Sequence, residues 1–186
     1  MSNKIEIVPI NVNTALKMCD RVMSTVYNNN PPSPNYLKIG VRLLLGTGIQ
    51  ESAGFIYARQ IGFKNDNTRG GWGYWQTELQ SLKHSYQYMK RRMALYNRVK
   101  DLLNDYSVDL DTLALDNLKF CKTMITSPMT NCVFSRLHYL KFTEPIPNNL
   151  NDQAEYWKKY YNTVKGKGTP QQYIRNWNLH TKNLDI

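Results

Sequence analysis

The fold is decided by one apolar stretch, Leu43-Leu44-Leu45-Gly46-Thr47-Gly48-Ile49-Gln50-Glu51-Ser52. Together with Ile39, its apolar residues predict a helix from about Asn35 to Ser52 that is apolar on most sides. Such a helix needs cover from other elements, so we expect it at the centre of the domain. The carboxyl of Glu51 near its end is costly to bury, because partial burial disfavours the ionised form and raises the pKa.

Helical patterns lie on both sides of this stretch. Apolar residues repeat at three- and four-residue intervals in the following segments: 14–26, 79–103, 113–125, 130–141, 152–164 and 170–177. Between them, residues 53–76 lack periodicity, and the turn-rich segment 64–73 is typical of a connection between two short strands. We expect one mainly α domain over residues 1–186, with a short β-hairpin or irregular loop.

Composition places the chain among globular domains. It has 186 residues, of which 41% are hydrophobic and 20% are charged, and no apolar run approaches the roughly 18 to 20 residues of a membrane span. The N-terminus lacks the apolar region of a signal peptide, so we expect no signal peptide and no membrane insertion. Cys19, Cys121 and Cys132 are odd in number and widely spaced, which favours buried thiols in a reducing compartment over a disulfide or zinc site.

A formal charge of +10 favours a polyanionic partner, such as nucleic acid, anionic lipid or an acidic cell-wall polymer. The strongest nucleic-acid feature is the cluster Lys90-Arg91-Arg92, with Tyr86, Tyr88 and Tyr96 interleaved on the predicted helix 79–103. The alternative is that these cations form a solvated helix face.

The best candidates for chemistry are Glu51 and the segment Gly70-Gly71-Trp72-Gly73-Tyr74-Trp75-Gln76. A carboxyl with a raised pKa stays protonated near neutral pH and can donate a proton. Glycines allow a ligand to approach the backbone, aromatic rings offer flat faces to sugars, and an amide both donates and accepts hydrogen bonds. The alternatives are a solvated helix end for Glu51, a tight turn for the glycines and core packing for the rings.

This combination, Glu51-Ser52 followed by Gly73-Tyr74-Trp75-Gln76, resembles the signature of lytic transglycosylases and goose-type lysozymes. Asn67 and Gly71 depart from the usual residues of that pattern, and Tyr161-Asn162 resembles a later element of the family. The resemblance implies a lysozyme-like α+β fold with Glu51 as the catalytic acid and base, and with Tyr161 helping to position it. It also implies the following substrate-binding residues: Ser52, Trp72, Gly73, Tyr74, Trp75, Gln76, Tyr161 and Asn162.

By this resemblance the chain is an enzyme that cleaves the β-1,4 bond between N-acetylmuramic acid and N-acetylglucosamine in peptidoglycan. Glycosidases normally use two carboxyl groups, and Asp66 and Glu78 flank the aromatic segment, although each also fits a loop or helix-start charge. A lytic transglycosylase needs only one, so hydrolysis and 1,6-anhydro ring formation both stay open. We expect no cofactor and no metal, since His84, His138 and His180 are scattered without ligand spacing.

The chain also resembles a group of tailed-bacteriophage proteins, notably over residues 138–147 and 156–163. That resemblance implies a phage protein, found in the virion or in the host cytoplasm before release to the periplasm. Its expected partners are peptidoglycan glycan strands and other virion proteins. Two alternatives stay open: a virion structural protein that keeps the fold without activity, and a basic helical nucleic-acid-binding protein.

Overall fold

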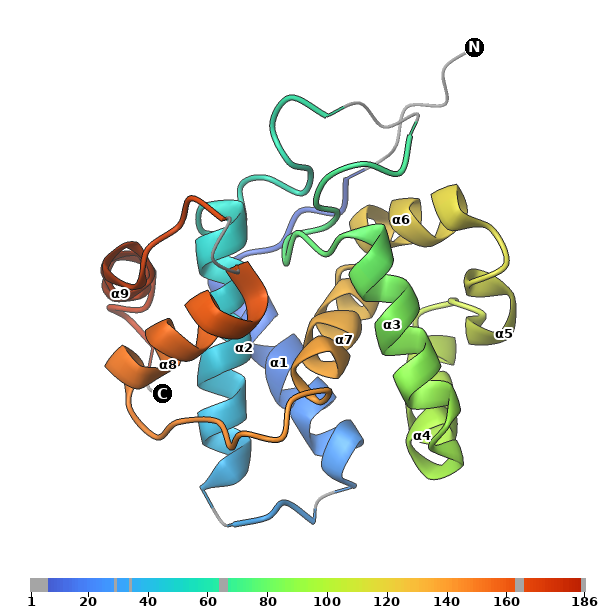
Figure 1. The fold of residues 1–186 in the computed structure, drawn as a ribbon, viewed down its shortest axis with the longest axis horizontal. Helices are drawn as coiled ribbons and strands as arrows, with labels where there is room; N and C mark the ends of the chain where they lie inside the picture. Colours follow the sequence, from blue (N-terminus) through green and yellow to red (C-terminus); the bar gives the residue numbers. More distant parts are fainter. Residues whose placement is uncertain (1–6, 29, 34, 64–66, 163–165, 185–186) are drawn as a thin grey trace.

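The computed structural model describes residues 7–28, 30–33, 35–63, 67–162 and 166–184. In these ranges the chain is mainly α-helical, as expected, and Figure 1 shows how the helices are arranged. The helices, with one short π-helix labelled η1, are α1 (Val12–Tyr27), α2 (Tyr36–Ser52), α3 (Leu79–Lys90), α4 (Met93–Asn104), α5 (Leu110–Leu113), α6 (Asn117–Thr126), α7 (Pro128–Tyr139), α8 (Leu150–Trp157), η1 (Lys158–Asn162) and α9 (Pro170–His180). None of the helices in these ranges has the length and apolar character that crossing a membrane requires.

Helix α2 lies in the interior, as its apolar pattern predicts, although α7 is the more completely buried helix. Helix α2 packs against α1, α7, α8 and α9 (Figure 1). Most of its residues are buried. Two glycines allow the close approach of neighbouring side chains: a Cβ at Gly46 would lie 2.1 Å from the hydroxyl of Tyr173, and one at Gly48 would lie 2.7 Å from the ring of Phe55. These glycines therefore serve packing, at the cost of some helix stability.

The predicted bounds of α2 are confirmed, since Asn35 is its N-cap residue and Ser52 its last residue. Helix α1 begins two residues before Thr14, because the side chain of Asn11 accepts a hydrogen bond from the backbone N–H of Thr14 at 2.9 Å. Its last turn is fixed by Arg98 of α4, whose guanidinium donates to the carbonyls of Thr25 and Val26 at 2.9 and 2.8 Å. Arg98 thus satisfies the free carbonyls of a helix end.

The prediction of one long helix over residues 79–103 is wrong. The helix is interrupted at Arg91 and Arg92, and Arg92 has the non-helical torsion angles φ −131° and ψ 79°. Met93, a member of the predicted apolar stripe, is 61% exposed because it begins α4 instead of continuing α3. The break allows α4 to pack against α1 as well as α3.

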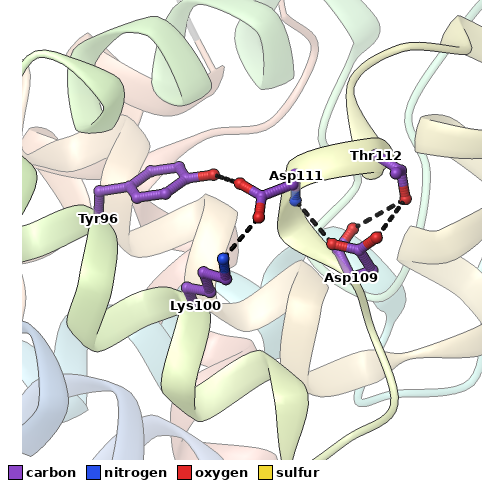
Figure 2. A network of polar contacts seen from close by, with 5 residues as sticks. All are labelled: Tyr96, Lys100, Asp109, Asp111 and Thr112. Atoms are coloured by element: carbon purple, nitrogen blue, oxygen red, sulfur yellow. Dashed lines mark hydrogen bonds and ion pairs between the residues drawn. The ribbon is translucent and has the colours of Figure 1, made fainter.

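The predicted helix 113–125 begins later, at Asn117, as α6, and Leu113 is instead the last residue of the separate helix α5; each of the two helices has an aspartate as its N-cap residue. Figure 2 shows how α5 is attached to α4: Asp111 accepts hydrogen bonds from Tyr96 and from Lys100, the latter at 2.5 Å. Asp109 caps α5 by accepting from the backbone N–H of Asp111 at 3.0 Å and from the hydroxyl of Thr112 at 2.9 Å (Figure 2). The periodicity of the sequence did not predict these caps, because apolar residues continue at helical spacing across the capped positions.

The C-terminal helices follow the predicted order with shifted ends. The helix predicted over residues 130–141 begins two residues earlier, at Pro128 of α7, since proline fits the first turn of a helix. The segment predicted as 152–164 is α8 followed by η1, and Val164 lies outside the described residues. The three cysteines are buried free thiols, as predicted, and the sulfur atoms of Cys19 and Cys132 lie 3.8 Å apart.

The β-hairpin expected within residues 53–76 is absent from the described part of the chain. Its place is taken by an irregular loop with two isolated bridges, Arg59 with Trp72 and Trp72 with Thr77. Buried Asn131 of α7 holds this loop. Its side chain accepts from the backbone N–H of Trp75 at 2.8 Å and donates to the carbonyl of Trp72 at 3.2 Å and the hydroxyl of Thr77 at 2.9 Å.

Replacing Asn131 with Ala should lower the free energy of unfolding by about 2 to 4 kcal/mol, because it leaves several buried polar groups without partners. Urea denaturation followed by circular dichroism measures the change. Asn104→Ala, at the exposed end of α4, is the control and should change stability by less than about 0.5 kcal/mol. Equal effects of the two substitutions would show that Asn131 does not anchor the loop.

Candidate active site

A groove of about 860 Å³ lies where the C-terminal end of α2 meets loop residues 53–61 and 71–78, the start of α3, and residues 161–162 and 166–168. Its lining is mixed in polarity and includes three groups of residues. From α2 and the loop come Gln50, Glu51, Ala53, Tyr57, Arg59, Gln60, Ile61, Gly71, Gln76, Thr77 and Glu78; from α3 and α7 come Ser81 and His138; and from the C-terminal part come Tyr161, Asn162, Gly166, Lys167 and Gly168.

The residue Glu51 is half-buried, and its carboxyl lies in this groove. Its Oε1 atom accepts a hydrogen bond of 2.9 Å from the indole N–H of Trp157, a fully buried residue of α8 whose ring lies beside that of Tyr173. Burial raises the pKa of Glu51 to about 7, with a smaller increase from the charge of Glu78, while the hydrogen bond from Trp157 lowers it. A carboxylic acid with this pKa is populated in both protonation states at neutral pH.

Ser52 has a structural role in this arrangement instead of the predicted place on the groove surface. It is fully buried, and its hydroxyl donates to the carbonyl of Gly48 at 2.6 Å and accepts from the backbone N–H of Phe55 at 2.8 Å. The turn that follows holds Ala53, Gly54 and Phe55 at positive φ, a region that is unfavourable for residues with a Cβ. Ser52 therefore stabilises a strained turn directly after the acid.

The rings of Trp72, Tyr74 and Trp75 are at most 2% exposed, so they do not offer faces to a sugar. The indole N–H of Trp75 donates to the carbonyl of Leu44 at 2.7 Å, and Phe55 packs edge-on against the rings of Trp75 and Tyr74. These three rings therefore pack in the core, which is the alternative to a sugar-binding role. Gly73, at φ +71°, faces Asn131 and α6 instead of the groove, because a Cβ there would lie 2.2 Å from the amide oxygen of Asn131.

Gln76 does line the groove, together with Gly71. Its amide nitrogen donates to the carbonyl of Gly73 at 2.8 Å, while its Oε1 atom is buried without a hydrogen-bond donor in the described part of the chain. The residue also has a positive φ of 48°. Such a strained residue at a groove is often associated with a functional role.

Tyr161 and Asn162 also line the groove, as the family resemblance implies. The hydroxyl of Tyr161 donates to the backbone carbonyl of Trp75 at 2.6 Å, so its hydrogen bond goes to the loop and not to Glu51. The charge of Glu51 nevertheless helps to raise the pKa of Tyr161, after the larger effect of burial. The hydrogen bond to the acid comes from Trp157, a residue that sequence reasoning did not assign to the site.

His138 is a second groove residue that sequence reasoning set aside. Burial and the charge of Lys141 lower its pKa to about 4, so the imidazole is neutral at pH 7. Its Nε2 donates to the carbonyl of Tyr160 at 2.7 Å, and its Nδ1 therefore accepts from the hydroxyl of Ser81 at 2.6 Å and the ammonium of Lys141 at 3.2 Å. His138 thus connects α3, α7 and η1 at the wall of the groove.

The exposed ring of the groove belongs to Tyr57, which is 48% exposed, with Ile61 at 76% beside it in the lining. Both lie in the 53–63 loop, where the sequence shows no periodicity and gave no reason to select them. Of the two candidates for a second carboxyl, Glu78 lines the groove and Asp66 lies outside the described residues. Within the described ranges, no group of three or more His, Cys, Asp or Glu residues is placed to hold a metal ion.

Comparison of the chain with models of protein families, with curated proteins and with solved structures found no match. The resemblance to lytic transglycosylases and goose-type lysozymes therefore rests on residues 51–76 and 161–162 of this chain.

The raised pKa of Glu51 predicts a specific pH dependence of stability. The folded protein binds the proton more tightly than the unfolded chain, so the contribution of Glu51 to stability falls as the pH rises from about 4.5 to about 7. Glu51→Gln removes this dependence, and its stability relative to the wild type should increase by up to about 3 kcal/mol between pH 4.5 and pH 8. Urea unfolding across this range measures the difference.

Glu155→Gln is the matched control, because it removes an exposed carboxyl from α8 without touching the groove. If the stability curves of Glu51→Gln and the wild type run parallel from pH 4.5 to pH 8, the carboxyl of Glu51 is not desolvated in the folded protein.

Proposed function

We propose that this protein cleaves the β-1,4 bond between N-acetylmuramic acid and N-acetylglucosamine in peptidoglycan, within a lysozyme-like fold. The observation that carries the proposal is the Glu51 carboxyl, which lies in a groove with its pKa raised to about 7. The resemblance of Glu51-Ser52, Gly73 to Gln76 and Tyr161-Asn162 to lytic transglycosylases and goose-type lysozymes supports the same assignment.

In the first step, protonated Glu51 donates its proton to the glycosidic oxygen as the bond to the anomeric carbon breaks. The indole N–H of Trp157 contacts Oε1 at 2.9 Å, so the other oxygen of the carboxyl is the one available to carry the transferable proton. The same indole N–H stabilises the carboxylate that this transfer leaves behind. Trp157 therefore both orients the acid and limits how far burial raises its pKa.

In the second step, the Glu51 carboxylate takes a proton from the group that attacks the anomeric carbon. That group is water in hydrolysis and the 6-hydroxyl of N-acetylmuramic acid in 1,6-anhydro ring formation. Glu78 lines the same groove, is exposed and contributes to the raised pKa of Glu51, so in a two-carboxyl route it would take the proton from water in place of Glu51. The product, a reducing end or an anhydro sugar, separates hydrolysis from ring formation.

Sugar binding falls to the exposed side chains of the groove. Tyr57 offers an aromatic face and Ile61 adds apolar surface, while the partly buried side chains of Gln76 and Asn162 line the groove beside them. The buried rings of Trp72, Tyr74 and Trp75 support this surface from beneath.

The Lys90-Arg91-Arg92 cluster is the strongest sequence feature in favour of nucleic-acid binding, and its contacts in the structure weaken that support. The ammonium of Lys90 lies 4.6 Å from the ring centre of Tyr96, and the guanidinium of Arg92 lies 3.7 Å from that of Tyr88. These tyrosine faces are occupied by the protein's own cations and are not free to stack on bases. We retain the cationic surface as a means of concentrating the enzyme on an anionic wall, in a phage virion or after release from the host cytoplasm.

Glu51→Gln keeps the shape of the side chain and removes the transferable proton. Clearing of purified peptidoglycan should therefore fall by about 100-fold or more, the usual scale for general acid catalysis. Turbidity and product analysis measure the loss, with Glu155→Gln as the control. Undiminished clearing by Glu51→Gln would contradict the proposed function.

Tyr57→Ala removes the exposed ring from the groove and should raise the KM for glycan strands by about tenfold, since aromatic contacts of this size contribute about 1 to 2 kcal/mol. Tyr106→Ala is the matched control, because Tyr106 is 43% exposed and lies outside the groove. Steady-state kinetics on soluble glycan strands separates KM from kcat. Equal KM values for the two variants would show that Tyr57 does not contribute to sugar binding.

A further inference from the structure

A second hollow, of about 620 Å³, lies next to the groove and is lined almost entirely by nitrogen-bearing side chains. Its lining consists of His84, Gln87, Tyr88, Arg91, Arg92 and Lys141. We call this hollow the cationic pocket. None of these six residues is acidic, and in the described part of the chain no ion pair joins them to an acidic side chain.

The cationic pocket continues directly from the groove along one face of α3. Ser81 lines the groove, and His84, Tyr88 and Arg91 follow it at intervals of three and four residues, which places all four on the same helix face. Ser81 and Arg91 are about 15 Å apart along the helix axis. The two sites also share a polar contact, because Lys141 of the pocket donates to His138 of the groove at 3.2 Å.

The protein holds two of the cationic side chains of the pocket in place, Arg92 and Lys141, and in the described part of the chain leaves a third, Arg91, free. The guanidinium of Arg92 lies against the ring of Tyr88, and its Nη1 donates to the backbone carbonyl of Tyr88 at 2.9 Å. Lys141 is half-buried, and desolvation lowers its pKa, so its ammonium lacks full hydration. Arg91 is exposed and makes no side-chain hydrogen bond in the described ranges, which leaves all its donors available.

We propose that the cationic pocket binds a carboxylate of the peptide stem carried by the glycan strand whose sugars occupy the groove. This inference rests on the proposed function. A stem branches from the sugar backbone and bears carboxylates, so a cationic site beside a glycan groove has the charge and the position to receive it. Guanidinium groups bind carboxylates through paired hydrogen bonds, a geometry that Arg91 can supply.

The kinetic test compares glycan strands that carry peptide stems with the same strands after an amidase has removed the stems. Arg91→Glu should raise the KM for stem-bearing strands by about tenfold, the effect of losing one charge-assisted hydrogen bond, and leave kcat unchanged. It should leave the KM for stripped strands unchanged. Lys17→Glu is the matched control, because Lys17 is exposed on α1 and lines neither site.

A binding test keeps the pocket separate from catalysis. Titration of the free stem tetrapeptide, followed by amide shifts in NMR spectra, should perturb residues around His84, Tyr88 and Arg91, and Arg91→Glu should weaken this binding by about tenfold. If the wild type binds the tetrapeptide but does not cleave wall glycan, the proposed function is contradicted and the pocket assignment is retained. Cleavage without peptide binding, or equal kinetic effects of Arg91→Glu on both substrates, would overturn the pocket assignment alone.

Nucleic acid is the competing ligand for such a pocket, and a short DNA duplex is its probe. The assignment predicts that the duplex does not displace the tetrapeptide in 150 mM salt. Displacement that depends on Arg91 would overturn the assignment in favour of phosphate recognition.

Discussion

The structure depends on one costly arrangement, a carboxyl group placed at the end of a largely buried helix. Helix α2 is enclosed by α1, α7, α8 and α9, and its last turn presents Glu51 to a groove instead of to open solvent. The indole N–H of Trp157 compensates part of the desolvation of that carboxyl. The contact requires α8 to lie close to α2, and the absence of a side chain at Gly46 makes room for Tyr173 of α9 beside it.

The remainder of the groove is built from loops that the helices hold in place. Three successive residues at positive φ, Ala53 to Phe55, turn the chain away from α2 immediately after Glu51. Asn131 of α7 fixes the 72–77 segment, and Tyr161 ties the same segment to η1 through the carbonyl of Trp75. Functional side chains commonly lie on loops positioned by a rigid scaffold, and here polar contacts provide the positioning.

The sequence was sufficient to predict the features that follow from local spacing. The apolar spacing between Asn35 and Ser52 predicted a buried helix with these bounds, whereas the burial of Glu51 was one of two alternatives that the sequence left open. Periodicity failed at Arg91-Arg92 and at residues 114–116, because the apolar spacing continues across both breaks while capping and packing end the helices. Residue types alone also left the burial of Trp72, Tyr74 and Trp75 undecided, since the same rings serve a core or a sugar surface.

The contacts that complete the site could not be predicted from the sequence, because they join residues that are far apart along the chain. Trp157 meets Glu51 across 106 positions, and His138 meets Ser81 across 57. Tyr57, in a loop without periodicity, is selected only by its exposure in the groove.

The central claim, that Glu51 is a desolvated acid poised near neutral pH, is tested most directly by NMR titration of its side-chain carboxyl carbon. Glu51→Gln assigns the signal. The account predicts a titration midpoint near pH 7 in the wild type, and a still higher midpoint in Trp157→Phe, which lacks the N–H that lowers the pKa. A midpoint near pH 4.5, unchanged by Trp157→Phe, would contradict it.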